Sequence, residues 1–281
     1  MTNHRLTEKL IREYLEQLCL DERSPATIRR YEKTIWLFYL DLPEDKLVNK
    51  ALVLKWKGQL TDTYAASTVN VMLSGLNGLF AFCGWDECHV KPLKCQRRVF
   101  QDVRRELTRA DYLKLLDAAK MLKKERLYLL METLCATGIR VSELQYITVE
   151  ALSTARVNVN CKGKQRVILL TKKLAQTLRE YCRRNRIECG PVFVTRTGKP
   201  LDRANIWREL KTLCNRANVD ADKVFPHNFR HLFAVAFYRM SKDIAKLADL
   251  LGHASIETTR IYIMESSREH ERQLSRLSFI L

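Results

Sequence analysis

The residues 250–265, LLGHASIETTRIYIME, place two side chains with chemical capability close together. His253 directly follows a glycine, and Tyr262 lies nine residues further on, behind a polar turn. A tyrosine hydroxyl can act as a nucleophile, and a histidine can sit beside the group that is attacked. The same pattern also fits a helix, a loop and a second helix whose tyrosine packs in a core. These sixteen residues do not separate the two interpretations.

A second fragment, PHNFRHLFAVAFY at 226–238, is typical of an anion site. His227 and Arg230 are three residues apart, hence on one face of a predicted helix that Pro226 would open. An imidazole and a guanidinium at a helix N-terminus suit a phosphate, because free backbone N–H groups and the positive end of the helix dipole face the same way. The alternative is a histidine that is structural and buried.

Two further fragments carry cations near predicted turns. ATGIRVSEL at 136–144 places Arg140 just past a glycine turn, where it could instead form a surface pair with Glu143. CKGKQR at 161–166 forms the basic tip of a predicted β-hairpin, so that Lys162 or Lys164 can reach a ligand. On its own, this tip could equally be a solubilising turn.

The distribution of charge indicates a polyanionic partner. The 281 residues carry 49 Lys and Arg against 32 Asp and Glu, a formal net charge of +17. Residues 1–98 are nearly balanced, with 15 basic and 12 acidic side chains, whereas residues 151–200 carry 12 basic and two acidic ones. This clustering favours nucleic acid over a merely solubilising surface. Within it, Lys164 and Arg166 are candidate DNA-binding residues.

Composition limits the class and the compartment of the protein. Apolar residues make up 46% of the chain, the share found in ordinary globular proteins. No apolar run reaches membrane-spanning length, and the first residues, MTNHRLTEKLIREY, lack the apolar region of a signal peptide, so we expect a cytoplasmic protein without a membrane partner. Nine cysteines in such a chain are not expected to form a disulfide set. CGWDECHVKPLKC at 83–95 lacks paired C-x2-C spacing, which favours a buried thiol at Cys83 over a zinc site.

The elements that must position these residues fall into two parts. Apolar residues at helical spacing predict four helices in the first ninety residues, one of them opened by Ser24 and Pro25, which indicates a small helical bundle. From Gly84 to Glu106 the periodicity fades. The predicted boundaries are a helical domain at 1–90, a linker at 91–106 and a second domain at 107–281.

The second part is predicted to be helical with a small β-hairpin. Thr108 would cap a helix with Asp111 at its third position, and another helix over about 126–137 would stop at Gly138. Alternating residues at 156–161 and an apolar run at 166–170 predict the hairpin, helices resume at Thr171, and 192–194 reads as a short strand. In the last fragment, Ser255 would cap a helix holding Tyr262 about two turns in.

Together, TGIRVSEL, the lysine hairpin, H-x-x-R-H and LGHASIETTRIY resemble the catalytic set of the tyrosine recombinases, the phage integrase family that includes the Xer recombinases. The resemblance covers the whole second half of the chain. The four-helix first half is also similar to the family's SAM-like core-DNA-binding domain. The expected fold class is therefore mainly α with a small β-hairpin (α+β), with a core-binding domain followed by a tyrosine-recombinase catalytic domain.

The resemblance implies a role for each residue. Tyr262 would be the nucleophile, Arg140 and Arg230 the clamps on the scissile phosphate, and His227 would assist the tyrosine proton transfer. His253 would hydrogen-bond the phosphate. Lys162 would be the general acid, with Lys164 as the alternate, because the family often has one more residue in this turn.

The implied reaction is strand cleavage and rejoining through a 3′-phosphotyrosyl intermediate. Two guanidiniums neutralise the phosphate anion, and the leaving 5′-oxygen takes a proton from the lysine. The covalent link conserves bond energy, so neither ATP nor a metal cofactor is expected, in keeping with a sequence that has no phosphate-binding glycine loop. We expect a site-specific DNA recombinase, an integrase or excisionase of a mobile element. The alternatives are a Xer-like resolvase of chromosome or plasmid dimers, a type IB topoisomerase, and a DNA-binding regulator with a degraded site.

The partner implied by the resemblance is double-stranded DNA, on which a homo-tetramer would join two recombination sites through a Holliday junction. An accessory DNA-bending or directionality protein is left open as a further partner. The chain starts directly with the core-binding helices, so we expect no module for additional arm-type sites. The tail beyond Tyr262, SSREHERQLSRLSFIL, would dock on a neighbouring protomer or pack on its own domain.

Overall fold

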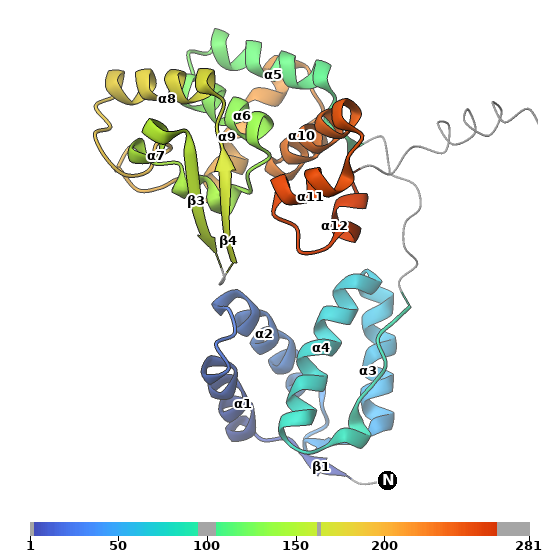
Figure 1. Ribbon diagram of the computed structural model, residues 1–281. Helices are drawn as coiled ribbons and strands as arrows, with labels where there is room; N and C mark the ends of the chain where they lie inside the picture. The colour runs from blue at the N-terminus through green and yellow to red at the C-terminus, as the bar shows by residue number, and fades with distance from the viewer. Residues whose placement is uncertain (1–2, 95–104, 162–163, 263–281) are drawn as a thin grey trace, which may run out of the picture. The chain divides into compact units, whose positions relative to one another are not determined.

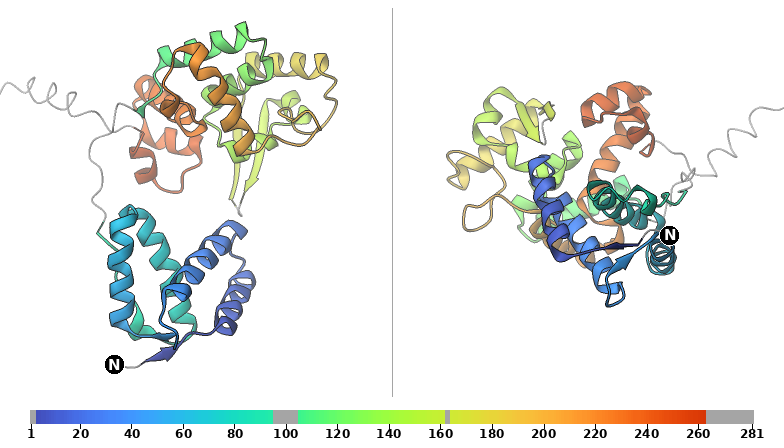
Figure 2. Two further views of the ribbon diagram at one scale, coloured as in Figure 1. Left: turned by 180° about the vertical axis from the view of Figure 1, so that it is seen from behind. Right: turned by 90° about the horizontal axis from the view of Figure 1, so that it is seen from below.

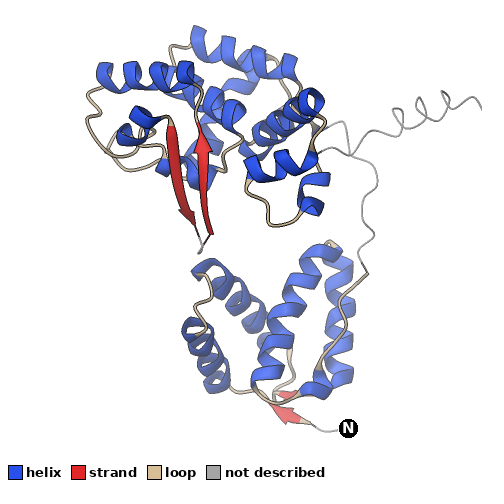
Figure 3. Cartoon of the chain, in the orientation of Figure 1, coloured by secondary structure: helices blue, strands red, loops and turns tan. Residues whose placement is uncertain are grey.

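The computed structural model describes residues 3–94, 105–161 and 164–262. The chain divides into two compact units, Met1–Arg97 and Arg98–Leu281, each with its own hydrophobic core. Helices dominate both units, and the sheets are two-stranded, which confirms the mainly helical fold class (Figure 3). No helix in these described ranges is both long and apolar enough to cross a membrane.

The first unit is a bundle of four helices in its described residues, with a two-stranded sheet and a 3-10 turn. Its elements are β1 (His4–Arg5), α1 (Glu8–Leu20), α2 (Pro25–Asp41), β2 (Leu47–Val48), α3 (Lys50–Thr63), α4 (Ala66–Phe82) and η1 (Asp86–Cys88). α1 and α2 lie beside each other, as do α3 and α4 (Figure 2). The predicted start of α2 is confirmed: Ser24 is the N-cap, its hydroxyl accepts from the Thr27 N–H, and Pro25 is the first helical residue.

The second unit consists of helices with one hairpin at its edge (Figure 1). Its elements are α5 (Arg109–Met121), α6 (Glu125–Thr137), η3 (Val141–Tyr146), α7 (Val149–Thr154), β3 (Arg156–Cys161), β4 (Lys164–Leu169), α8 (Lys172–Arg184), α9 (Arg203–Ala217), η4 (Ala221–Lys223), α10 (Pro226–Ser241), α11 (Ile244–Leu251) and α12 (Ile256–Arg260). α10 packs on α6, and α11 packs on both α10 and α12, so the last described helices are joined to α6 through α10.

The helix ends of this unit follow their local capping chemistry. Thr108 and Asp111 form the predicted capping box at the start of α5. Gly138 ends α6 at φ 60°, and Gly252 ends α11 at φ 61°, both in the left-handed region that glycine adopts without cost. A Cβ at Gly138 would also lie 2.4 Å from Cδ1 of Phe233 on α10, so this glycine permits close packing as well as the turn.

The structure corrects three local predictions. Residues 192–194 form no strand, since Val194 makes only an isolated bridge to Pro200 and lacks a partner strand there. β4 begins at Lys164 rather than 166, because Lys164 already pairs with Cys161 of β3. α12 ends at Arg260, so Tyr262 lies in the following turn and not two turns into a helix.

Candidate active site

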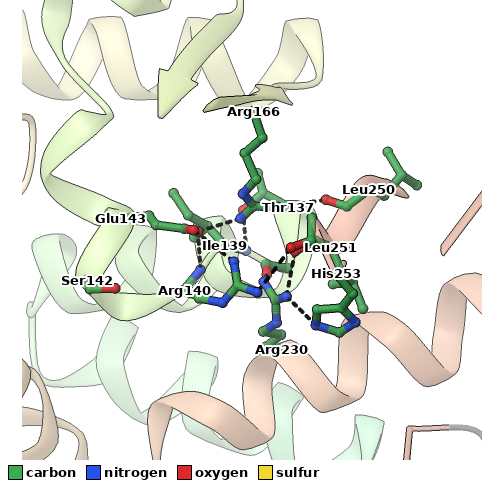
Figure 4. A network of polar contacts seen from close by, with 12 residues as sticks. Thr137, Ile139, Arg140, Ser142, Glu143, Arg166, Arg230, Leu250, Leu251 and His253 are labelled. Atoms are coloured by element: carbon green, nitrogen blue, oxygen red, sulfur yellow. Dashed lines mark hydrogen bonds and ion pairs between the residues drawn. The ribbon is translucent and has the colours of Figure 1, made fainter. Parts of the chain in front are cut away.

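Three cations meet at the C-terminal end of α11. The consecutive carbonyl oxygens of 250, 251 and 252 each accept a hydrogen bond from a different arginine (Figure 4). The pairs are Arg166 Nη1 with Leu250 at 2.9 Å, Arg230 Nη2 with Leu251 at 2.7 Å, and Arg140 Nη2 with Gly252 at 3.3 Å. Carbonyls at a helix C-terminus lack helical partners and lie at the negative end of the dipole, so they suit cations.

Arg230 is the most enclosed of these arginines. It is the fifth residue of α10, is 2% exposed, and also donates through Nη1 to the carbonyl of Gly138 at the end of α6. Burial and the neighbouring charge of Arg140 lower the pKa of Arg230 to about 10, which still leaves it protonated at neutral pH. The residue therefore joins the ends of α6 and α11 and keeps its charge.

Arg140 lies at the N-cap of η3 with a side chain that is 40% exposed. Its backbone N–H and its Nη1 donate to the two carboxylate oxygens of Glu143, at 2.9 and 3.0 Å. The pairing with Glu143 that the sequence offered as a surface contact is present, but Glu143 is only 3% exposed and belongs to the site. Glu143 was not singled out as a functional residue; its spacing of three from Arg140 was the available signal.

His253 connects the arginine cluster to α12. Its Nε2 lies 2.9 Å from Nη2 of Arg230, and its Nδ1 lies 2.9 Å from Oγ1 of Thr259. Burial and the charges of Arg230 and Arg140 lower the pKa of His253 to about 4, so it is neutral at pH 7. Thr259, fully buried, was missed from the sequence, where nothing distinguished it from its neighbour Thr258.

Three histidine rings surround Tyr262. The ring of His253 stacks on it with centroids 5.7 Å apart, and those of His227 and His231 lie at 5.7 and 5.4 Å. The Tyr262 hydroxyl is 3.4 Å from Nε2 of His227. Tyr262 is 5% exposed and packs in a small apolar cluster with Leu247 and Leu251, so its ring belongs to a core while its hydroxyl faces an imidazole.

His227 is a neutral imidazole at neutral pH. Burial, followed by the charges of Arg230 and Arg140, lowers its pKa below the ordinary 6.5, so the imidazole is neutral at pH 7. A neutral imidazole has one nitrogen free to accept, and Nε2 is the one that faces the tyrosine hydroxyl. His231 is the last residue of the H-x-x-R-H motif and has no role among the expected site residues. It is 7% exposed, and burial lowers its pKa to about 4.

A cleft of about 850 Å³ opens beside these residues. Arg140, His227 and Arg230 line one part of it, and Arg203, Trp207 and Lys211 of α9 line another, whereas Tyr262 and His253 are not among its lining residues. Trp207 is 47% exposed, and the Lys211 ammonium lies 5.2 Å from its ring centroid. The lining holds more cations than anions, which suits a polyanion.

The hairpin residues are placed unequally. Arg166, expected to contact DNA, has a side chain that is only 13% exposed, and its guanidinium turns inward to Glu143 as well as to the carbonyl of Leu250. Lys162 lies outside the described residues, and of Lys164 the structure describes only the backbone in β4. The tail beyond Tyr262 also lies outside the described residues.

One group of potential metal ligands occurs in the described part of the chain, and it is remote in sequence from the arginine cluster. His4, Glu87 and Cys88 bring their ligand atoms within 4.8 Å of one another. The His4 ring pairs with the Glu87 carboxylate, and burial raises the pKa of the fully buried Cys88 thiol. A hydrogen-bonded His4–Glu87 pair beside a neutral thiol accounts for this group. Cys83 is half-buried against the same core, as expected of a structural thiol.

Comparison with known proteins gives a consistent picture. The profile of the phage integrase family matches residues 105–269. Tyrosine recombinase XerA of Thermococcus kodakarensis is 30% identical over 265 residues, which cover 90% of each chain. The structure of a lambda integrase dimer bound to a COC′ core site superposes with a TM-score of 0.74 at 18% identity, over 94% of this chain and 78% of that one. The structure of XerH recombinase bound to difH, in a pre-cleavage complex, superposes with a TM-score of 0.68 at 19% identity, over 93% of this chain and 83% of that one.

Proposed function

We infer the function from the family: this chain belongs to the phage integrase family and is a tyrosine recombinase, an enzyme that exchanges DNA strands. Within that family we propose that it is a Xer-like site-specific recombinase that resolves dimers of a circular chromosome or plasmid. The relative at 30% identity over nine-tenths of both chains is a Xer recombinase. The likeness to lambda integrase, at 18% identity, concerns the fold alone. The preference for a mobile-element integrase that we drew from the sequence therefore has less support than its alternative.

The observation that carries the proposed chemistry is the position of the Tyr262 hydroxyl, 3.4 Å from Nε2 of a neutral His227. His227 would take the hydroxyl proton as Tyr262 Oη attacks the scissile phosphorus. Hydrogen bonds to a catalytic base are often long before substrate binds, so this separation is compatible with the role. The new bond is a 3′-phosphotyrosyl ester, and the bond that breaks releases the 5′-oxygen.

Arg140 and Arg230 would bind the non-bridging oxygens of that phosphate. Both guanidiniums are held by protein oxygens before substrate arrives, so little reorganisation accompanies charge development in the transition state. A hairpin lysine, Lys162 or its alternate Lys164, would give a proton to the departing 5′-oxygen. Religation would reverse these steps with the 5′-hydroxyl of another strand as nucleophile.

The role proposed for His253 changes in one respect. Its Nε2 accepts from Arg230 and its Nδ1–H donates to Thr259, so neither ring nitrogen is available to a phosphate in this arrangement. We propose that His253 orients Arg230 toward the phosphate, and that any direct contact of its own with DNA requires the ring to move.

Double-stranded DNA would be the substrate, with four protomers joining two sites. Solved structures of similar fold are described as a lambda integrase dimer on a core site and as XerH bound to difH, in keeping with DNA as the substrate. The four-protomer arrangement proposed here corresponds to that of a lambda integrase tetramer on a Holliday junction, a further structure of similar fold.

The test is capture of covalent protein–DNA adducts on denaturing gels from the DNA of the source organism, followed by sequencing of the attached DNA. Adducts at one short inverted repeat in the chromosome or a plasmid, absent from Tyr262→Phe, would support the resolvase. Adducts at the ends of a mobile element would support the integrase instead, and adducts without a shared sequence would indicate a topoisomerase. Adducts that persist in Tyr262→Phe would eliminate this tyrosine as the nucleophile.

A further inference from the structure

Arg166 and Arg140 share one buried carboxylate. Glu143 is 3% exposed; its Oε2 accepts from the Arg140 backbone N–H and from Arg166 Nη2, and its Oε1 accepts from Arg140 Nη1 (Figure 4). Burial alone would raise the pKa of Glu143, but the hydrogen bonds from Arg166 and Arg140 outweigh it and lower the pKa below 4.5. Glu143 is therefore ionised at neutral pH and places a full negative charge beside Arg140.

A carboxylate in this position weakens the attraction of Arg140 for the substrate phosphate, the role proposed for this arginine. If Glu143 and Arg140 were an isolated pair, their charges would cancel and the pair would present little net field to an incoming phosphate. Arg166 adds a second cation to the same carboxylate, so the group of three keeps one positive charge in excess. Of the two arginines, Arg140 has the more exposed side chain, at 40% against 13%, and it lines the cleft.

The fold holds Arg166 in this inward position. Its aliphatic chain lies against Gly252, where an added Cβ would come within 2.4 Å of the Arg166 Cδ. Its Nη1 donates to the carbonyl of Leu250, and its Nε is buried without a hydrogen-bond partner among the residues that the structure describes. A buried Nε without a partner is unfavourable, which argues that this side chain is held by its charge contacts.

We infer that Arg166 is a positioning residue that compensates the charge of Glu143, so that Arg140 keeps its positive charge for the substrate phosphate. The inference rests on the proposed function in that it takes the cleft at Arg140 as the phosphate site. It assigns Arg166 an electrostatic part acting through Glu143 in place of direct contact with DNA. Glu143 also accepts from both the backbone N–H and the side chain of Arg140, at 2.9 and 3.0 Å.

The experiment measures binding of inorganic phosphate to the full chain at fixed pH, followed by the NMR resonances of His227, which lines the cleft with Arg140. Arg166→Gln should weaken phosphate binding by about tenfold, as expected when one nearby unit charge is lost at moderate effective dielectric. Arg166→Lys should stay within about threefold of the wild type, because it keeps the charge. Arg216→Gln, at an exposed arginine of α9, is the matched control for a general loss of charge.

The decisive variant is the double substitution Arg166→Gln with Glu143→Gln. Removing both the carboxylate and its compensating cation leaves the charge of Arg140 uncancelled, so phosphate binding should return to within about threefold of the wild type. The double variant also avoids a buried, half-paired carboxylate if Arg166→Gln alone folds poorly. A thermal melt of each variant separates folding from binding.

Several results would overturn the inference. It is wrong if Arg166→Gln binds phosphate like the wild type, if Arg166→Lys is as weak as Arg166→Gln, if the double variant stays weak while folded, or if the wild type binds no phosphate at tens of millimolar. Failure of the recombinase proposal has a different signature, since it would leave the wild type without a Tyr262–DNA adduct while the phosphate results follow the predicted order.

Discussion

Arg230 donates a hydrogen bond from Nη2 to Nε2 of His253 across 2.9 Å. A guanidinium has no acceptor atom, so Nε2 of His253 must be the unprotonated nitrogen and Nδ1 must carry the hydrogen. That hydrogen points at Oγ1 of Thr259, 2.9 Å away. The tautomer of His253 is thus fixed from both sides, by a cation on one face and a buried hydroxyl on the other.

Thr259→Val should therefore impair an arginine that it does not touch. Valine has the same shape without the acceptor, leaving the Nδ1–H of His253 buried and unpaired at a cost of about 1–3 kcal/mol. A change of tautomer that moved the hydrogen from Nδ1 to Nε2 would place an N–H donor of His253 against the N–H donor of Arg230. We expect adduct formation to fall by about tenfold or more while DNA binding persists, measured on a cleavage substrate obtained from the adduct-sequencing experiment.

Two variants serve as controls for Thr259→Val. Thr259→Ser keeps the hydroxyl and should keep activity, and Thr258→Val makes the same change at the exposed neighbour. Equal activity of Thr259→Val and Thr258→Val would show that the tautomer of His253 is not controlled by this hydroxyl.

Stability should fall as the pH is lowered from about 6.5 toward 4. Burial lowers the pKa of His231 and of His253 to about 4, and lowers that of His227 below 6.5. Between the unfolded and folded pKa values the unfolded chain binds more protons, so the free energy of unfolding rises with pH across this window and is fully present above 6.5. Glu143 affects stability at lower pH. Because its pKa in the folded protein is below 4.5, its contribution to the free energy of unfolding is lost only as the pH falls below about 4.5.

Urea unfolding at a series of pH values tests this assignment. His231→Gln should reduce the slope of the free energy of unfolding against pH between 6.5 and 4.5, a range in which Glu143 contributes little to that slope. An unchanged slope in His231→Gln, with the protein folded at pH 7.5, would contradict a neutral buried imidazole at this position.

Gly138→Ala should be more costly than the same change at another left-handed glycine. Alanine at φ 60° costs about 1 kcal/mol through its backbone, and its Cβ would meet the Phe233 ring at 2.4 Å, adding about 1–3 kcal/mol of overpacking. Gly198 has φ 77° with nothing within 4 Å, so Gly198→Ala should show only the backbone cost. Urea unfolding of both variants gives the comparison, and equal losses would mean that α6 and α10 can separate freely here.

A general acid among the hairpin lysines can be identified by changing the leaving group. A substrate with sulfur in place of the 5′-bridging oxygen releases a thiolate, which needs no proton. If Lys162 is the acid, Lys162→Ala should cleave the normal substrate slowly and the sulfur substrate at close to the wild-type rate, whereas Lys164→Ala should show no such rescue. The reverse pattern would assign the role to Lys164, and rescue of neither would remove the hairpin from proton transfer.

Much of the local structure could be predicted because it depends on neighbours within a few residues. Ser24 with Pro25, Thr108 with Asp111, and the glycines 138 and 252 each start or stop a helix through hydrogen bonds or backbone conformations that their own segment supplies. Locality also explains a failure: the apolar residues 192–194 resemble a strand, but a strand needs a partner that the segment itself cannot reveal.

The sequence by itself determined the reactive fragments, their order and their likeness to the tyrosine recombinases. The tertiary structure decided how these fragments meet. Arg140 reaches a carbonyl 112 positions away, Arg230 one 92 positions away and Arg166 one 84 positions away. Such contacts depend on how α6, β4 and α11 dock through their apolar faces, which no local pattern encodes. For that reason Arg166 could be recognised as a cation in the sequence, but its inward orientation toward Glu143 emerged only from the packed fold.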